Sequence, residues 1–287
     1  VKQGIARLLE ADRLVREKLA GITVDYLPRL YEAETNCARR LLEFAQSRFP
    51  EPKGLETMIR RTAEESGIRY SDEQTSAIRE AAASGLLLIT GGPGTGKTTI
   101  LNGILELLGR MQLRCLLAAP TGRAAKRLSE VTGEDASTIH RLLEAGIDPA
   151  TGKMFFARDE ENPLKCDAVI VDEMSMVDIQ LLHSLLQAIP QGKRLILVGD
   201  PDQLPPVGPG FPFGDMLRSG CLPSVRLTEI FRQAQQSLIV MNAHRVNQGE
   251  MPDLKCVTSD FFFMRRNSED GVCGLNRDTV SYTKLTM

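Results

Sequence analysis

The sequence predicts an α/β fold in which a mostly parallel sheet carries helices on both faces and follows a small helical domain. Two observations predict this fold. From Ser71 onward, short and nearly continuous apolar runs alternate with helical segments, a pattern typical of parallel strands buried on both faces. Every motif with candidate functional residues also lies just after one of these runs, where parallel sheets bind their ligands. The expected strands are 86–90, 115–119, 168–173, 194–200 and 225–229.

The residues before Ser71 predict helices. Apolar side chains at helical spacing predict a first helix through 5–19, a second within 25–49 and a third at 55–66. Nothing there suggests chemistry, so we expect a structural domain or a contact surface for another protein. Farther along, IDPATGKMFF (147–156) has turn formers between two short apolar ends and predicts a β-hairpin. The expected organisation is a helical domain at 1–69, a sheet domain at 70–252 with a hairpin insertion near 146–163, and a short tail at 253–287.

Composition restricts the class of protein. The chain has 287 residues and a formal net charge of −2, from 35 Lys and Arg against 37 Asp and Glu. This balance excludes a protein that binds nucleic acid through bulk positive charge. No apolar run reaches the roughly 18 residues that span a bilayer, and the charged first segment is not a signal peptide. The six cysteines form no C-x-x-C pair, so we expect reduced thiols in a cytoplasmic protein, with a zinc site or a disulfide framework as the alternative.

The segment LITGGPGTGKTT (88–99) predicts a phosphate-binding loop between a strand and a helix. Its spacing is Gly91-x-x-x-x-Gly96-Lys97-Thr98, in which the glycines allow backbone amides to turn toward phosphate oxygens. We expect Lys97 to reach the β- and γ-phosphates of a nucleotide and Thr98 to hold Mg²⁺, at the positive end of the helix that follows. The expected nucleotide-binding residues are Gly92, Pro93, Gly94, Thr95, Gly96, Lys97, Thr98 and Thr99.

Polar side chains also end two later apolar runs. Asp172 and Glu173 end AVIVDE; Asp172 is suited to hold Mg²⁺ through its water shell, and Glu173 to orient an attacking water. Gln203 follows the next run, in a loop rich in proline and glycine. Its amide is suited to sense a γ-phosphate, although it is equally explained as a polar loop residue.

Six sequence blocks, taken in order and spacing, resemble the RecD-like branch of the superfamily 1 DNA helicases, which also includes TraA-type relaxase helicases. The blocks are GGPGTGKTT (91–99), AAPTGRAAKRL (118–128), STIHRLL (137–143), VIVDEMSMVD (169–178), LVGDPDQLPPVGPG (197–210) and LTEIFRQ (227–233). The resemblance covers about residues 1–263 and implies a RecA-like P-loop NTPase domain. It also implies ATP and Mg²⁺ as cofactors, and 5′-to-3′ movement along single-stranded DNA.

The resemblance assigns roles at the matching positions. Gln74 matches the glutamine that recognises adenine, although alone it predicts an exposed helix residue after an N-cap at Ser71. Gln203 matches a motif that couples the nucleotide site to DNA. Arg232 matches an arginine that contacts the γ-phosphate, although alone it predicts a helix-surface arginine. The expected catalytic residues are Lys97, Asp172, Glu173, Gln203 and Arg232, and the expected Mg²⁺ ligands are Thr98 and Asp172.

The resemblance also implies a path for single-stranded DNA. Thr121 and the backbone near Gly122 would bind a phosphate, and Arg123 and Lys126 would supply positive charge. His140 is similar to a strand-contacting histidine of the family, or is a structural helix residue. Phe155 and Phe156 of the hairpin lie where family members carry a strand-separating pin, and we expect at least one of them to pack against the domain instead. The expected DNA-binding residues are Pro120, Thr121, Gly122, Arg123, Lys126 and His140.

The resemblance stops after residue 263. Family members continue with a second RecA-like motor domain that closes the ATP site with an arginine, and this chain has no such motif. Together with the missing initial methionine, this suggests a part of a helicase without its second motor domain. We therefore expect weak Mg·ATP binding, very slow hydrolysis and no unwinding. The alternatives are a non-helicase P-loop ATPase of the AAA type and a nucleotide-responsive binding module.

Overall fold

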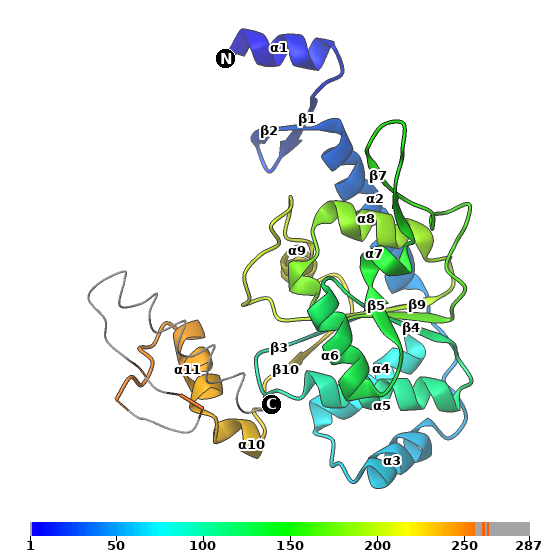
Figure 1. Ribbon diagram of the computed structural model, residues 1–287, viewed down its shortest axis with the longest axis vertical. Helices are drawn as coiled ribbons and strands as arrows, with labels where there is room; N and C mark the ends of the chain where they lie inside the picture. Colours follow the sequence, from blue (N-terminus) through cyan, green and yellow to red (C-terminus); the bar gives the residue numbers. More distant parts are fainter. Residues whose placement is uncertain (1, 256–259, 262, 264–287) are drawn as a thin grey trace. The chain divides into compact units, whose positions relative to one another are not determined.

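The computed structural model describes residues 2–255, 260, 261 and 263 (Figure 1). The chain divides into two compact units, one ending at Glu229 and the other beginning at Ile230. All strands of the described residues lie in the first unit. The described helices of the second unit are α10 (Arg232–Gln235) and α11 (Leu238–Asn247).

The centre of the first unit is a six-stranded sheet in which every pair of neighbours is parallel, so the predicted α/β fold is confirmed. The strand order is β10-β3-β9-β8-β4-β5. The strands are β3 (Leu86–Gly91), β4 (Cys115–Ala119), β5 (Ala136–Thr138), β8 (Ala168–Val171), β9 (Arg194–Gly199) and β10 (Ser224–Leu227). Five of them match the apolar runs of the sequence. The sequence does not predict β5, because its three residues, Ala-Ser-Thr, form no apolar run.

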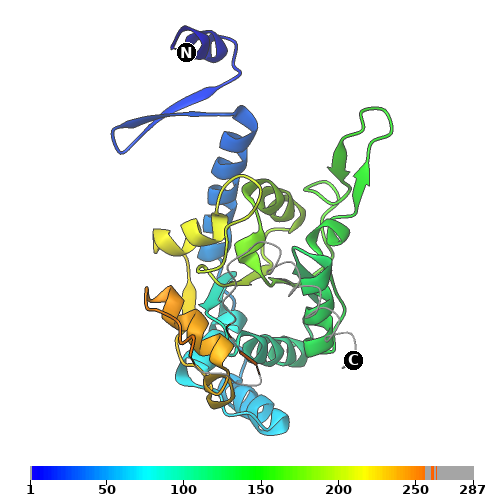
Figure 2. The ribbon, with the colours of Figure 1, turned by 60° about the vertical axis from the view of Figure 1, so that its left-hand side comes forward.

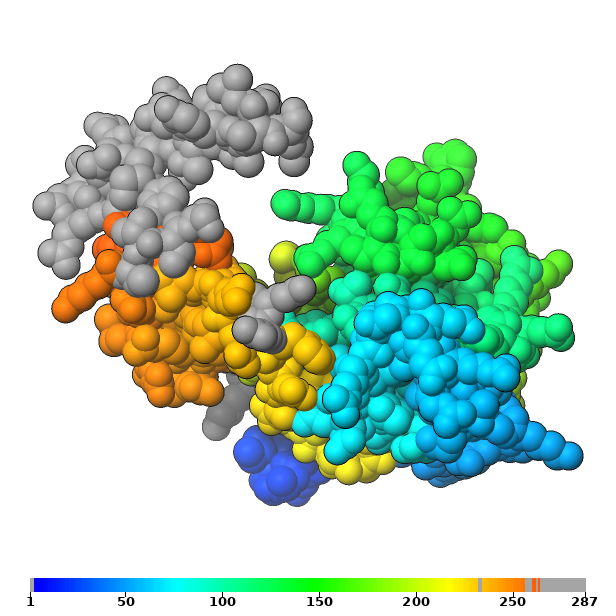
Figure 3. Space-filling model, turned by 90° about the horizontal axis from the view of Figure 1, so that it is seen from below, coloured from blue at the N-terminus to red at the C-terminus, as the bar shows by residue number. Residues whose placement is uncertain are grey.

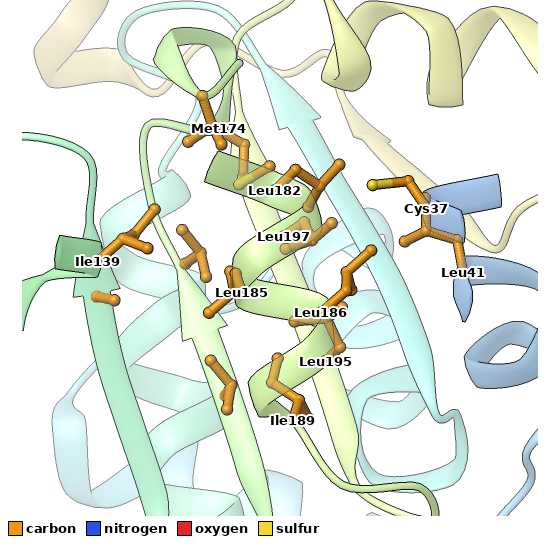
Figure 4. Packing of buried hydrophobic residues seen from close by; sticks show 14 of the residues in the cluster. Cys37, Leu41, Ile139, Met174, Leu182, Leu185, Leu186, Ile189, Leu195 and Leu197 are labelled. Atoms are coloured by element: carbon orange, nitrogen blue, oxygen red, sulfur yellow. The ribbon is translucent and has the colours of Figure 1, made fainter. Parts of the chain in front are cut away.

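Helices cover both faces of the sheet. Successive strand residues point to opposite faces, so Ile196 of β9 belongs to one apolar cluster and Leu197 to the other. The helices that pack with Leu197 are α2 (Pro28–Gln46), α7 (Ile139–Leu142), α8 (Ile179–Ala188) and α9 (Pro212–Ser219). Figure 4 shows leucines of α8 between β9 and α2. The helices that pack with Ile196 are α3 (Leu55–Ser66), α4 (Asp72–Ala83), α5 (Lys97–Arg110) and α6 (Gly122–Thr132). Figure 3 views the unit from the side of α3.

The predicted first helix is wrong beyond residue 10. The helix α1 (Lys2–Glu10) is followed by an antiparallel hairpin of β1 (Val15–Leu19) and β2 (Ile22–Tyr26), which leads into α2 (Figure 2). Ala20 and Gly21 both have left-handed φ angles, +48° and +83°, and a two-residue turn of this kind joins antiparallel strands. A cross-strand ion pair of 2.6 Å between Arg16 and Asp25 adds to the hairpin. The apolar spacing at 14–19 therefore belongs to a strand.

The second and third predicted helices are confirmed as α2 and α3. Both contribute to the two apolar clusters of the sheet: Cys37 and Leu41 of α2 to one, and Leu55 and Ile59 of α3 to the other. Because of this shared packing, the first compact unit continues to Glu229 and does not divide at 69/70, where the sequence suggested a boundary.

The predicted hairpin insertion is confirmed as β6 (Ala145–Ile147) and β7 (Met154–Phe156). Its turn is held by the Asp148 carboxylate, which accepts hydrogen bonds from the Ala150 amide (2.8 Å) and from the Thr151 hydroxyl (2.7 Å). Gly152 supplies the left-handed φ of +65° that the turn requires.

No helix within the described ranges is long and apolar enough to cross a membrane.

The described cysteines are free thiols: Cys37, Cys115, Cys166 and Cys221. Burial raises the pKa of Cys37 to about 12 and that of Cys115 and Cys166 to about 11, so these three thiols stay protonated at neutral pH. Cys256 and Cys273 lie outside the described residues, as does most of the tail expected at 253–287.

Candidate functional site

The loop between β3 and α5 has the backbone geometry of a phosphate cradle. Gly94 and Gly96 adopt left-handed φ angles of +76° and +80°, which residues with a Cβ rarely adopt. The Thr95 hydroxyl donates a hydrogen bond of 2.9 Å to the Gly92 carbonyl inside the loop. A Cβ at Gly91 would lie 2.5 Å from the Thr95 hydroxyl, so this close approach requires glycine. Thr98 and Thr99 follow, partly buried in the first turn of α5.

Lys97 is the first residue of α5, and its side chain folds over the loop. Its Nζ donates hydrogen bonds to the carbonyls of Gly91 and Gly92, the latter at 3.1 Å. Burial lowers the pKa of the Lys97 ammonium. Three carboxylates oppose this effect by raising the pKa: those of Asp200, Glu173 and Asp172.

Asp172 and Glu173 follow β8 directly, and the two side chains differ in environment. The Asp172 carboxylate accepts a hydrogen bond of 2.8 Å from the Glu173 amide. Burial nevertheless raises the pKa of Asp172, and the nearby charge of Glu173 raises it further. Glu173 has a left-handed φ of +56°, which turns the chain sharply into the 3-10 turn at Met174–Met176. Strain of this kind, about 1–3 kcal/mol, is typical of functional sites.

Asp200 is a site residue that the sequence analysis missed. It follows β9, which lies between β3 and β8, so its carboxylate stands between the phosphate loop and the Asp172–Glu173 pair. The side chain is 3% exposed and accepts a hydrogen bond of 3.1 Å from the Asp202 amide. Among the charges near Lys97, that of Asp200 acts most strongly on the ammonium. The signal in the sequence was an acidic residue directly after an apolar run, as in AVIVDE.

Gln203 is held by a second residue that the sequence analysis missed. The Ser175 hydroxyl, in the turn after β8, donates a hydrogen bond of 3.1 Å to Oε1 of Gln203. Its Nε2 is therefore left as the donor of the exposed amide. Gln203 thus links the loop after β9 to the turn that follows Asp172 and Glu173.

Gln74 is buried, with only 1% of its surface exposed. The sequence of its helix alone predicted an exposed residue. Gln74 forms a capping box with Ser71. Oε1 of Gln74 accepts a hydrogen bond of 3.1 Å from the backbone amide of Ser71, and the backbone amide of Gln74 donates one of 3.3 Å to the Ser71 hydroxyl. The predicted N-cap at Ser71 is therefore confirmed. Nε2 of Gln74 is buried and has no hydrogen-bond partner among the described residues. Such an orphaned donor needs an explanation, and a ligand acceptor supplies one.

Glu73 fixes this end of α4 to the sheet. Its carboxylate accepts hydrogen bonds from the amide of Thr228 (2.9 Å) and from its hydroxyl (2.6 Å). These hydrogen bonds lower the pKa of Glu73. Thr228 directly follows β10, the neighbour of β3, so Gln74 lies at the same edge of the sheet as the phosphate loop.

The residues predicted to bind DNA also lie at this edge. Thr121 caps α6 by accepting a hydrogen bond of 3.2 Å from the Ala124 amide, and Thr138 caps α7 by accepting one of 3.1 Å from the Arg141 amide. The two helices begin side by side, because Ala119 of β4 pairs with Thr138 of β5. Pro120 and Gly122 flank the first cap, and Arg123 and Lys126 are exposed on α6.

The aromatic residues of the hairpin differ from each other. Phe156 packs against the apolar core, with its ring centroid 5.8 Å from that of His140, so the expectation that one phenylalanine packs is confirmed. Phe155 is 48% exposed, and its ring lies over Gly146 on the paired strand.

Arg232 begins α10 in the second unit, and its side chain lies outside the described part of the chain.

Comparison with known proteins gives consistent matches. Residues 74–209 match the family described as AAA domain. The chain is 38% identical over 251 residues to the ATP-dependent RecD2 DNA helicase of Deinococcus radiodurans, covering 86% of this chain and 34% of that protein. It is 41% identical over 169 residues to the RecBCD enzyme subunit RecD of Mycolicibacterium smegmatis, covering 51% of this chain and 30% of that protein. The crystal structure of the Pif1 helicase from Candida albicans aligns with a TM-score of 0.48 and 24% identity, covering 75% of this chain and 55% of that one. The chain spans about a third of the length of the curated relatives it matches.

We predict that Asp172→Asn stabilises the chain at pH 7 by about 0.5–2 kcal/mol, as removal of a charge buried at a functional site often does. Burial raises the pKa of the Asp172 carboxyl, so folding disfavours its ionised form. The gain should therefore shrink as the pH falls toward about 4, where aspartate becomes protonated in both states. Urea unfolding of both chains between pH 4.5 and 7.5 measures this difference in the free energy of unfolding.

Asp167→Asn is the matched control with the opposite sign. Its carboxylate accepts hydrogen bonds from the Arg114 amide (3.0 Å) and from Lys193 (3.1 Å), and these lower its pKa. Asp167 therefore contributes stability above its unfolded pKa and loses it as the pH falls. Asp167→Asn should destabilise the chain at pH 7. Equal destabilisation by both substitutions would contradict our assignment of Asp172.

Proposed function

We propose that the chain is an ATP-binding motor domain of a DNA helicase of the RecD-like branch of superfamily 1, as its similarity to the RecD2 and RecD proteins supports. The observation that carries this proposal is the order of the strands. The phosphate loop after β3, Asp200 and Gln203 after β9, and Asp172 and Glu173 after β8 follow neighbouring strands of one parallel sheet. The two capped helix starts after β4 and β5 continue the same edge.

ATP would bind with its phosphates in the glycine loop and against the first turn of α5. Lys97 would exchange its hydrogen bonds to the loop carbonyls for bonds to the β- and γ-phosphates. The Thr98 hydroxyl and the Asp172 carboxylate are oxygen ligands suited to Mg²⁺, and a dication would stabilise the carboxylate that burial disfavours. When bound, Mg²⁺ would neutralise part of the phosphate charge.

Hydrolysis needs a positioned water and compensation of charge at the γ-phosphate. Glu173 is suited to orient the water, because its left-handed backbone turns it out of the strand beside Asp172. Gln203 offers Nε2 as a donor, since Ser175 occupies Oε1. From the family resemblance, Arg232 would contact the γ-phosphate, and a second motor domain of the same protein would close the site.

The buried amide of Gln74 supports recognition of adenine. Its unpartnered Nε2 is a donor, and adenine offers N7 as an acceptor beside the N6 amino group, which an amide can contact at the same time. The nucleotide would then span from α4 across the end of β3 to the end of β8.

Single-stranded DNA would run over the starts of α6 and α7. The backbone at Gly122 and the side chains of Arg123 and Lys126 suit phosphate oxygens. Of the two hairpin phenylalanines, Phe155 is the exposed one and would meet the DNA. Movement in the 5′-to-3′ direction, and a protein partner bound through residues 1–69, complete the proposal.

Gln74→Glu tests the adenine contact. Glutamate keeps the oxygen that caps α4 but replaces the orphaned donor with an acceptor, which opposes N7 of adenine. We expect the affinity for Mg·ATP to fall by about 1–3 kcal/mol, the penalty of an unsatisfied buried group. The affinity for inorganic tripolyphosphate, which has no base, should stay unchanged. Calorimetric titration of both ligands measures the difference; equal losses for both would argue against adenine at this position.

Arg123→Ala tests the DNA path. We expect weaker binding of oligothymidylate and a salt dependence reduced by about 0.7 in the log–log slope, the value for one phosphate contact on a single strand. Fluorescence anisotropy at several salt concentrations measures both, and the affinity for Mg·ATP should be unaffected. Lys165→Ala is the matched control, because this exposed lysine precedes β8 at the opposite edge of the sheet. Equal effects of the two substitutions, or none, would refute the proposed path.

A further inference from the structure

The helix α5, which begins at the phosphate loop, is joined to α6, the helix that would carry the DNA contacts. Nδ2 of Asn102 in α5 donates a hydrogen bond of 3.0 Å to the carbonyl of Val131 in the last full turn of α6. Ile100, Leu101 and Leu128 also belong to one apolar cluster under the same face of the sheet. These contacts fix α6 to α5.

Arg127 lies one helical turn from this junction, on the side of the nucleotide site. It precedes Val131 by four residues in α6, as Thr98 precedes Asn102 by four residues in α5. Four residues correspond to about 6 Å along a helix axis, so Arg127 and Thr98 are displaced equally from the junction toward the carboxyl edge of the sheet.

The Arg127 side chain is exposed on α6. Within the described residues Arg127 makes no hydrogen bond or ion pair, whereas its neighbour Lys126 lies 3.7 Å from Glu130. Its exposed guanidinium is thus free to bind a ligand.

We propose that Arg127 positions the terminal phosphate of ATP and couples this contact to single-stranded DNA bound at the start of α6. The inference rests on the proposed function. Arg123 lies in the first turn of α6, where DNA would bind, and Arg127 lies one turn farther along the same helix. A guanidinium pairs with phosphate oxygens through two parallel hydrogen bonds, and a small shift of α6 would form or break them. Such coupling is reciprocal: DNA would raise the affinity for ATP, and ATP the affinity for DNA.

The test measures equilibrium affinities of the chain for a non-hydrolysable ATP analogue and for ADP, each with Mg²⁺, with and without oligothymidylate. In the unaltered chain, oligothymidylate should raise the affinity for the analogue about tenfold, within the usual range of coupling. In Arg127→Ala, the analogue should bind several-fold more weakly, ADP should bind unchanged, and the coupling should disappear. Oligothymidylate alone should bind Arg127→Ala as it binds the unaltered chain.

Two further variants keep the test decisive. Arg127→Lys retains the charge but not the paired hydrogen bonds, so it should restore part of the analogue affinity and little of the coupling. Arg60→Ala, an exposed arginine of α3 with only a 3.7 Å contact to Glu64, should change nothing. Unaltered coupling in Arg127→Ala, or no coupling in the unaltered chain, would overturn the inference. Failure of the proposed function itself would show differently, as nucleotide binding that survives Lys97→Ala.

Discussion

The partly buried ammonium of Lys97 among three carboxylates is the interaction on which the rest of the site depends. Burial disfavours the charged lysine, and the carboxylates of Asp200, Glu173 and Asp172 offset this cost. They come from the ends of β9, the neighbour of the strand that carries the loop, and of β8, the next strand along, so the parallel order of the strands brings them together. The same packing disfavours the ionised form of Asp172, a cost that the proposed dication would offset.

The sheet edge extends this arrangement toward a second ligand. Beyond β8, the strands β4 and β5 end in two threonine-capped helices, and on the other side of the loop β10 holds α4 through Glu73. The residue proposed to contact adenine, the glycine loop, the acidic pair and the helix start proposed to bind a DNA phosphate therefore occupy one continuous edge. Under the proposed function, this edge would link a nucleotide to a nucleic acid through rigid elements, because α5 and α6 share both a hydrogen bond and an apolar core.

Much of this could be predicted from the sequence, because apolar runs specify buried strands and the glycine spacing specifies the loop. What the sequence missed depends on contacts between distant residues. The role of Asp200 requires β9 to lie between β3 and β8, and strand order is not encoded in any local pattern. The burial of Gln74 depends on packing of α4 against the sheet, where Glu73 binds Thr228, 155 residues away. The hairpin at 15–26 depends on a left-handed φ at Ala20, a residue type that rarely adopts it.

The central claim, that one sheet edge forms the nucleotide site, is tested most directly by amide hydrogen exchange with and without Mg·ATPγS. Our account predicts slower exchange at 91–99, 172–175 and 200–203, the segments that follow β3, β8 and β9, with no change in α2 or α9 on the opposite face of the sheet. Protection confined to α2 and α9, or an absence of protection after all three strands, would contradict it.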